Sequence, residues 1–145
     1  MIRRFGKNAV LGRRYELRPG AYAILPRGGE LLLTYQGGMF CEFQLPGGGI
    51  DPGESPLRAL YREVMEETGW RIAAPRKLGA FRRFTYMPEY DLWAEKLCHI
   101  YLAQPVLCLG DPPEQDHTAV WTKTDVAKSI LSNEGDRSFV EKLFA

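Results

Sequence analysis

Short apolar runs recur along the chain between glycines, prolines and charged residues, which predicts strands and helices mixed in one unit. The runs Ala21–Leu25 and Leu31–Tyr35 flank Pro26–Glu30, whose proline and glycines are typical of a hairpin turn. The other runs expected to form strands are Phe43–Leu45, Lys77–Tyr86, Lys96–Ala103 and Ala119–Trp121. No linker or repeat separates these elements, so we expect a single α/β domain over residues 1–145.

A central helix is expected between two clear end signals. Ser55 suits the N-cap, Pro56 suits the first helical position, and Gly69 suits the residue that stops the helix. Between them, apolar residues recur at helical spacing, namely Leu57, Leu60, Tyr61 and Val64. Two further helices are expected near the end of the chain, at Asp125–Leu131 and at about Asp136–Phe144.

Three glutamates of the central helix share one face, since Glu63, Glu66 and Glu67 are spaced i, i+3 and i+4. Their charges repel, and the helix dipole disfavours an anion in the last turn by roughly 0.3–1 kcal/mol. Such a cluster is often only a solvated surface. Here the run Gly47–Gly49 lies just upstream, and consecutive glycines let the backbone approach a ligand or a metal closely. Together the glycines and the helix favour a metal site.

The glycine run and the helix belong to one spaced motif. Five residues separate Gly48 from Glu54, and seven separate Glu54 from Arg62. The positions that carry the motif are Gly48, Glu54, Arg62, Glu63, Glu66, Glu67 and Gly69. The motif, which runs from Gly48 to Trp70, resembles the signature of the Nudix hydrolases at every position. This resemblance implies the Nudix fold, a mixed β-sheet sandwiched between α-helices. It also implies metal-dependent hydrolysis of the pyrophosphate linkage in a nucleoside diphosphate derivative.

The resemblance further implies roles for the residues of the motif. The implied ligands of Mg²⁺ or Mn²⁺ are the carboxylates of Glu63, Glu66 and Glu67 and the backbone carbonyl of Gly47. Glu63 is a ligand, a general base, or both, because family members differ at this point. Arg62 completes the expected catalytic group, and its partner Glu54 fixes the loop against the helix. The number of metal ions and the identity of the general base stay open.

Outside the motif the candidates are weaker. Many relatives carry one more acidic ligand shortly before a strand that contains a tryptophan, which implies Glu114 here, with Asp116 as the second choice. Glu95 opens a strand, and a similar glutamate contributes to the site in some relatives. Tyr86 lies where enzymes acting on dinucleoside polyphosphates carry a tyrosine for base stacking, although aromatic residues in strands are more often core. The substrate stays open between a nucleoside triphosphate, a dinucleoside polyphosphate and similar compounds.

The histidines and cysteines form no catalytic or metal pattern of their own. We interpret His99, in an alternating strand, as a packed core residue and His117 as a surface loop residue. Three cysteines without paired spacing predict free, buried thiols and a reducing compartment. The cytoplasm is therefore the expected location.

The resemblance implies a small nucleotide as substrate, and the charge of the chain gives no indication of a nucleic-acid partner. A net charge of +1 gives no overall electrostatic footprint for nucleic acid. Basic residues do gather near the N-terminus, at Arg3, Arg4, Lys7, Arg13 and Arg14. No apolar run approaches the length that spans a membrane. Two alternative functions stay open, an RNA 5′-end pyrophosphohydrolase and a catalytically silent Nudix-like nucleotide-binding or regulatory domain. A homodimer is also possible for this chain.

Overall fold

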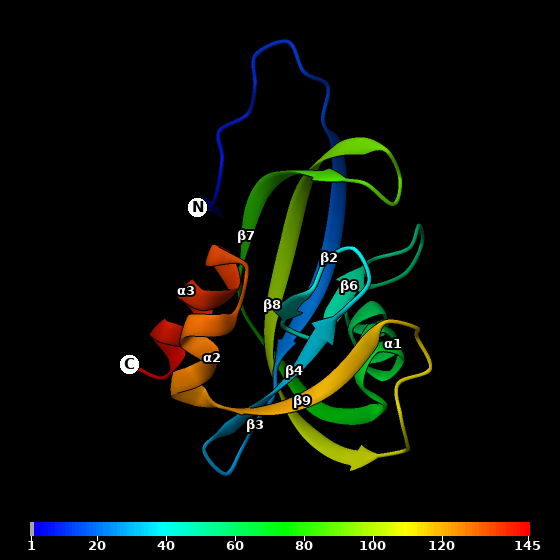
Figure 1. Cartoon of the computed structure of the whole chain (residues 1–145), viewed down its shortest axis with the longest axis vertical. Helices are drawn as coiled ribbons and strands as arrows, with labels where there is room; N and C mark the ends of the chain where they lie inside the picture. The colour runs from blue at the N-terminus through cyan, green and yellow to red at the C-terminus, as the bar shows by residue number, and fades with distance from the viewer. Residues whose placement is uncertain (1) are drawn as a thin grey trace.

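The computed structural model describes residues 2–145, which form two β-sheets and three α-helices (Figure 1). The strands are β1 (Arg3–Arg4), β2 (Glu16–Ile24), β3 (Pro26–Arg27), β4 (Glu30–Gln36), β5 (Glu42–Gln44), β6 (Gly47–Gly49), β7 (Trp70–Met87), β8 (Leu92–Cys108) and β9 (His117–Lys123). The helices are α1 (Pro56–Thr68), α2 (Thr124–Ile130) and α3 (Glu134–Leu143). The mixed α/β architecture expected from the sequence is confirmed.

The larger sheet mixes parallel and antiparallel pairing in the strand order β1-β7-β8-β2-β6. β2 runs parallel to β8, whereas β7 is antiparallel to β8 and β6 is antiparallel to β2. In the smaller sheet, β3, β5 and β9 all pair antiparallel with β4. β6 therefore forms one edge of the larger sheet, and α1 packs beside it.

Two apolar cores lie on opposite faces of the larger sheet. Ile100 and Tyr101 are neighbours on β8, yet they belong to different cores because successive strand residues point to opposite faces. Leu60 of α1 packs in the core that contains Tyr101, and Val140 of α3 packs in the core that contains Ile100. The helices thus cover both faces, and α1 packs against β2 and β6.

The hairpin and the long strands differ in part from expectation. The turn at Gly28 and Gly29 forms, but it joins β3 to β4, because β2 ends at Ile24 and pairs with β8 in the other sheet. β7 and β8 are also longer than expected. Irregularities in their pairing, near Ala74 and Gly79, interrupt the alternation by which a strand is recognised in the sequence.

The glycine run itself is a strand and not a loop. Gly47–Gly49 pairs antiparallel with β2, and Gly47 lies opposite Tyr22.

The two later helices begin earlier than expected. Thr124 opens α2, so Asp125 lies in its first turn and does not cap it. Asn133 caps α3 by accepting hydrogen bonds from two backbone N–H groups.

The cysteines and one histidine also test the sequence interpretation. All three cysteines are free, but only Cys98 is buried, whereas Cys41 and Cys108 are exposed. The expected burial is therefore wrong for two of them, since they lie at a turn and at a strand end. His99 is half-buried on β8, and its buried Nδ1 has no hydrogen-bond partner. Among residues 2–145, no helix is long and apolar enough to cross a membrane.

Candidate metal centre

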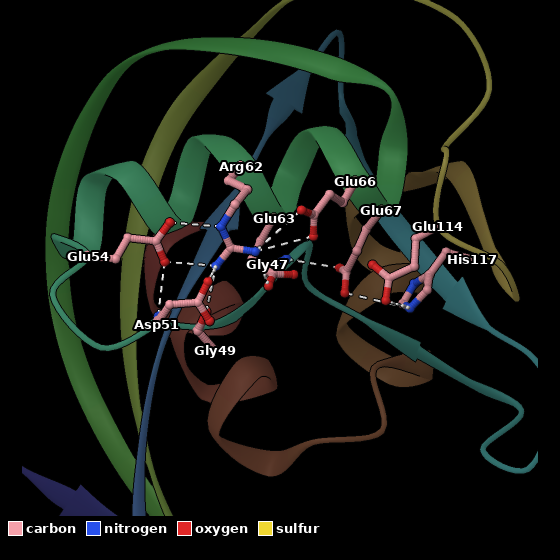
Figure 2. A network of polar contacts seen from close by, with 10 residues as sticks. All are labelled: Gly47, Gly49, Asp51, Glu54, Arg62, Glu63, Glu66, Glu67, Glu114 and His117. Carbon is pink, nitrogen blue, oxygen red and sulfur yellow. Dashed lines mark hydrogen bonds and ion pairs between the residues drawn. The ribbon is translucent and has the colours of Figure 1, made fainter. Parts of the chain in front are cut away.

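The ends of α1 are fixed by the residues expected to fix them. The Ser55 hydroxyl accepts a hydrogen bond from the Arg58 N–H at 3.2 Å, which caps the first turn. At the other end Gly69 adopts a left-handed conformation, φ 76°, and its N–H donates to the Met65 carbonyl. These caps place the three glutamates on the last two turns of the helix, where their side chains point to one side (Figure 2).

Arg62 is the centre of the polar network on this face (Figure 2). Its Nε and Nη2 donate to the two carboxylate oxygens of Glu54, each at 2.8 Å. Its Nη1 donates to Oε1 of Glu63 at 2.9 Å and to Oε2 of Glu66 at 3.3 Å. Nη2 also donates to the Gly49 carbonyl at 3.0 Å. One guanidinium therefore ties α1 to β6 and to the loop between them.

The pair of Glu54 and Arg62 is strongly ionised. The hydrogen bonds from Arg62 lower the pKa of Glu54 to about 2, and the N–H of Asp51 adds to this effect. The same hydrogen bonds raise the pKa of Arg62 further above its usual value. The pair therefore keeps both charges at pH values near neutrality.

β6 brings the glycine backbone directly against the carboxylates of α1. The Gly47 N–H donates to Oε1 of Glu67 at 3.1 Å. A Cβ atom added at Gly48 would overlap the Glu63 carboxylate, and one added at Gly47 would overlap the backbone of β2. At Gly49 an added Cβ would meet no atom within 4 Å. The close approach of strand and helix therefore requires glycine at the first two positions of the run.

The carboxylates differ in their exposure to solvent. The side chain of Glu67 keeps 8% of its accessible surface, whereas that of Glu66 keeps 41%. Burial raises the pKa of Glu67 well above its usual value, although the hydrogen bond from Gly47 opposes this. Burial also raises the pKa of Glu63, even though Arg62 lies beside it. Both buried carboxylates therefore need positive charge that the surrounding residues do not supply in full.

Glu114 joins the cluster from the loop before β9 (Figure 2). Its N–H donates to the Glu66 carbonyl at 3.1 Å, which holds the loop against the end of α1. One carboxylate oxygen from each of Glu63, Glu66 and Glu114 lies within 4.8 Å of the others. The structure therefore brings together the motif glutamates and the additional acidic residue that the sequence indicated.

His117 is a member of the site that the sequence interpretation missed. It is the first residue of β9, and its side chain is buried instead of lying in an exposed loop. Its Nδ1 lies 2.9 Å from Oγ1 of Thr34 on β4, and its Nε2 faces Glu67 and Glu114. Only the pairing of β4 with β9 places the ring there. Its spacing of three residues from Glu114 was the one available signal, and it is weak.

A family comparison decides the identity of this fold and site. The profile of the NUDIX domain matches residues 15–143, which is nearly the whole chain. The chain belongs to the Nudix family. A Bacillus subtilis protein with the provisional name 8-oxo-dGTP diphosphatase is 35% identical over 74 residues, 51% of this chain and 50% of that protein. The RNA pyrophosphohydrolase of Pectobacterium atrosepticum is 41% identical over 61 residues, 42% of this chain and 34% of that protein. The matched segments thus span half or less of these curated relatives.

Solved Nudix structures match over most of the chain. A NUDIX hydrolase from Nitrosomonas europaea superposes with a TM-score of 0.73 at 20% identity and covers 89% of each chain. A MutT NUDIX hydrolase from Burkholderia pseudomallei superposes with a TM-score of 0.70 at 25% identity, over 88% of this chain and 98% of that one. The expected Nudix fold is thereby confirmed.

The acidic cluster of this Nudix protein fits a divalent cation by the chemistry of its donors. The cluster comprises four carboxylates, those of Glu63, Glu66, Glu67 and Glu114. The guanidinium beside them is already shared with a fifth carboxylate. Carboxylate oxygens are the ligands that hard divalent cations prefer. A cation there would supply the positive charge that the buried carboxylates lack.

Of the remaining sequence candidates, Tyr86 and Glu95 lie apart from this Nudix cluster, whereas Asp116 lies beside it. Tyr86 is near the tip of the β7–β8 hairpin, where its ring packs on Trp93 at 5.2 Å between centroids and its hydroxyl donates to Asp91. Glu95 pairs with Arg82 at 3.4 Å on the same hairpin. The Asp116 carbonyl accepts a hydrogen bond from the Gly37 N–H at 2.7 Å, in a turn beside the site. Among the described residues, no hydrogen bond or ion pair joins these side chains to the cluster. Their predicted roles stay predictions.

Proposed function

We propose that this Nudix protein hydrolyses the pyrophosphate linkage of a nucleoside diphosphate derivative, with Mg²⁺ or Mn²⁺ as its cofactor. The observation that carries this proposal is the convergence of four carboxylates at one end of α1. Carboxylates repel an anionic substrate unless dications bridge the two. A pyrophosphate linkage offers adjacent oxygens for such bridging. The donor set therefore supports a phosphate anhydride as substrate in preference to a neutral or cationic compound.

The residues of the chain position the reaction. Bound dications would neutralise the phosphate charge and acidify a water molecule. Arg62 holds Glu63 and Glu66 in place through Nη1, and the Gly47 N–H holds one oxygen of Glu67. We assign Glu63 as the candidate general base, because Arg62 holds its carboxylate within the cluster through a hydrogen bond of 2.9 Å. It would take the proton of the attacking water as that oxygen bonds to phosphorus and the anhydride P–O bond breaks. The carbonyl of Gly47 is a further candidate ligand.

The nucleoside part of the substrate is less constrained by the site. One relative has a name that refers to an oxidised purine triphosphate and another has a name that refers to RNA. Both matches cover half or less of the relative, so their activities suggest a substrate class for this chain only as hypotheses. Tyr86 is exposed enough to stack on a base, but it lacks a contact with the cluster. A nucleoside triphosphate or a dinucleoside polyphosphate is our first candidate.

An RNA 5′-end pyrophosphohydrolase is the second candidate. The relative from Pectobacterium atrosepticum favours it, and so does the basic segment near the N-terminus. In that segment Arg13 lies over the Trp93 ring at 3.8 Å, an arrangement that could contact a nucleotide chain. The net charge of +1 argues against an RNA substrate. A cytoplasmic location and a homodimer remain predictions from the sequence.

A substrate panel tests the proposal. Protein freed of metal by a chelator is assayed with Mg²⁺ or Mn²⁺ on nucleoside triphosphates, oxidised purine triphosphates, dinucleoside polyphosphates and 5′-triphosphorylated RNA. We expect phosphate or pyrophosphate release only when metal is present, with ¹⁸O from labelled water in a phosphate product. Glu67→Gln should lower kcat by at least ~10²-fold. Glu89→Gln, at the exposed hairpin tip, serves as the control and should change little. Full activity in chelator, or no hydrolysis of any compound, would contradict the proposal.

A further inference from the structure

His117 has one nitrogen engaged by the protein and the other directed at the carboxylates. Its side chain keeps only 4% of its accessible surface. Nδ1 lies 2.9 Å from Oγ1 of Thr34, which fixes the orientation of the ring between β9 and β4. Histidines that ligate a metal usually have their other ring nitrogen held by a protein group in this way, which fixes the ring and leaves one nitrogen free to face the metal.

The second nitrogen has no hydrogen bond of its own. Nε2 lies 3.7 Å from Oε2 of Glu67 and 3.9 Å from Oε1 of Glu114, and both distances exceed a hydrogen bond. The ligand atoms of these three residues nevertheless lie within 4.8 Å of one another. The other oxygen of Glu67 is held by the Gly47 N–H, so Oε2 is the one free to face the ring. This spacing suits three ligands around one ion better than it suits an ion pair.

We propose that Glu67, Glu114 and His117 form a nitrogen-containing metal position beside the all-oxygen position of Glu63, Glu66 and Glu114. This inference rests on the proposed function, because both positions share Glu114 and one anionic substrate. What the inference adds to the proposed function is a preference of this second position for one class of metal. Mg²⁺ prefers oxygen ligands, whereas imidazole is a good ligand for transition metals such as Co²⁺, Ni²⁺ and Zn²⁺. The second position is therefore selective for transition metals.

The competing explanation is that His117 only orients Glu67. In that case the ring would donate a hydrogen bond from Nε2 to the carboxylate, and it would do so with any dication bound nearby. A direct ligand behaves differently, because the metal ion binds the lone pair of an unprotonated Nε2 and changes the chemical shift of that nitrogen. The two explanations thus predict different nuclear magnetic resonance spectra for one nitrogen atom.

The chain suits this measurement because it contains two histidines. Tag-free protein with ¹⁵N-labelled histidine is titrated with Zn²⁺ and separately with Mg²⁺. We expect Zn²⁺ to shift the His117 Nε2 resonance to the range of a metal-bound nitrogen, with no proton on that nitrogen. Saturating Mg²⁺ should leave that nitrogen unbound. The His99 resonances serve as an internal control, because His99 lies on β8 outside the cluster.

Variants give a second readout by calorimetry. His117→Gln should weaken Co²⁺ binding at least ~10-fold, the lower end of what even an outer-shell partner contributes. Its Mg²⁺ affinity should stay within about threefold of the parent, and His99→Gln should change neither. If Zn²⁺ binds without moving the His117 nitrogen, the inference is wrong and the proposed function stands. If neither Zn²⁺ nor Mg²⁺ binds at all, the proposed function is wrong as well.

Discussion

The Glu63 carboxylate lies so close to the α-carbon of Gly48 that a single methyl group on that carbon would overlap it. The contact joins the middle of β6 to the face of α1 that carries the acidic cluster. Glu63 also accepts a hydrogen bond from Arg62 at 2.9 Å, so its carboxylate is confined on two sides. The position of this carboxylate therefore depends directly on the absence of a side chain on β6.

Gly48→Ala should displace Glu63 and lower the metal-dependent activity by about 10²-fold, the scale of a misplacement of about 1 Å. Gly49→Ala is the matched control. It lies in the same strand, carries no neighbour within 4 Å of an added Cβ, and should retain activity within about twofold. Steady-state kinetics and circular dichroism of both variants make the comparison. Equal losses in the two variants would show that the strand, and not the Glu63 contact, is what matters.

Arg62→Lys should impair catalysis while the fold survives. Lysine keeps the positive charge but cannot donate two parallel hydrogen bonds to Glu54 while it also holds Glu63. We expect kcat to fall about 10- to 100-fold, as for other residues that orient metal ligands. Arg58→Lys, on an exposed face of the same helix, should have no effect. Normal turnover of Arg62→Lys would mean that charge alone fixes the site.

The helix and the motif could be predicted because their signals are local. Ser55, Pro56 and Gly69 act on backbone groups within a few residues, and the structure places both ends of α1 where they indicate. The pairing of Arg62 with Glu54 was also accessible, since it joins residues eight apart within one motif. Local rules were thus sufficient for this part of the site.

The parts that could not be predicted depend on strand pairing between distant segments. His117 reaches the cluster only because β9 pairs with β4, where Thr34 holds its ring. Gly47–Gly49 becomes a strand only because β2 lies beside it, since glycine itself carries no strand preference. No residue spacing in the sequence indicates which distant strands will pair. For this reason the sequence predicted a surface loop residue at His117 and a loop at Gly47–Gly49.

Metal ions should stabilise the protein by relieving repulsion in the cluster. At a concentration 100 times the dissociation constant, one bound ion contributes about 2.7 kcal/mol. Thermal melts in chelator and in excess Mg²⁺ or Mn²⁺ measure the shift in midpoint. Glu67→Gln should raise the stability of the metal-free protein more than Glu66→Gln does, because Glu67 is buried and Glu66 is partly exposed beside Arg62. Both variants should reduce the metal-induced shift in the melting midpoint. Identical midpoints with and without metal would mark the cluster as a solvated surface.

A buried carboxylate outside the acidic cluster, that of Asp136, predicts how stability depends on pH. Asp136 lies in the first turn of α3 with 4% of its surface accessible. Burial raises its pKa to about 6, although Arg83, Lys96 and a hydrogen bond from the Leu45 N–H oppose this. In the unfolded chain the group ionises near pH 4. Between those two values the unfolded state loses its proton first, so ionisation favours unfolding as the pH rises.

Asp136→Asn should remove this cost while keeping an acceptor oxygen for the Leu45 N–H. Relative to the parent, the variant should gain about 3 kcal/mol of unfolding free energy between pH 4 and pH 7. The gain should develop around pH 4–6 and level off above pH 6. Urea unfolding in chelator across this range measures it. Glu134→Gln controls for the dipole of α3, since it removes an exposed charge from the same first turn. A difference between Asp136→Asn and the parent that stays constant with pH would show that Asp136 ionises as easily in the folded protein as in the unfolded chain.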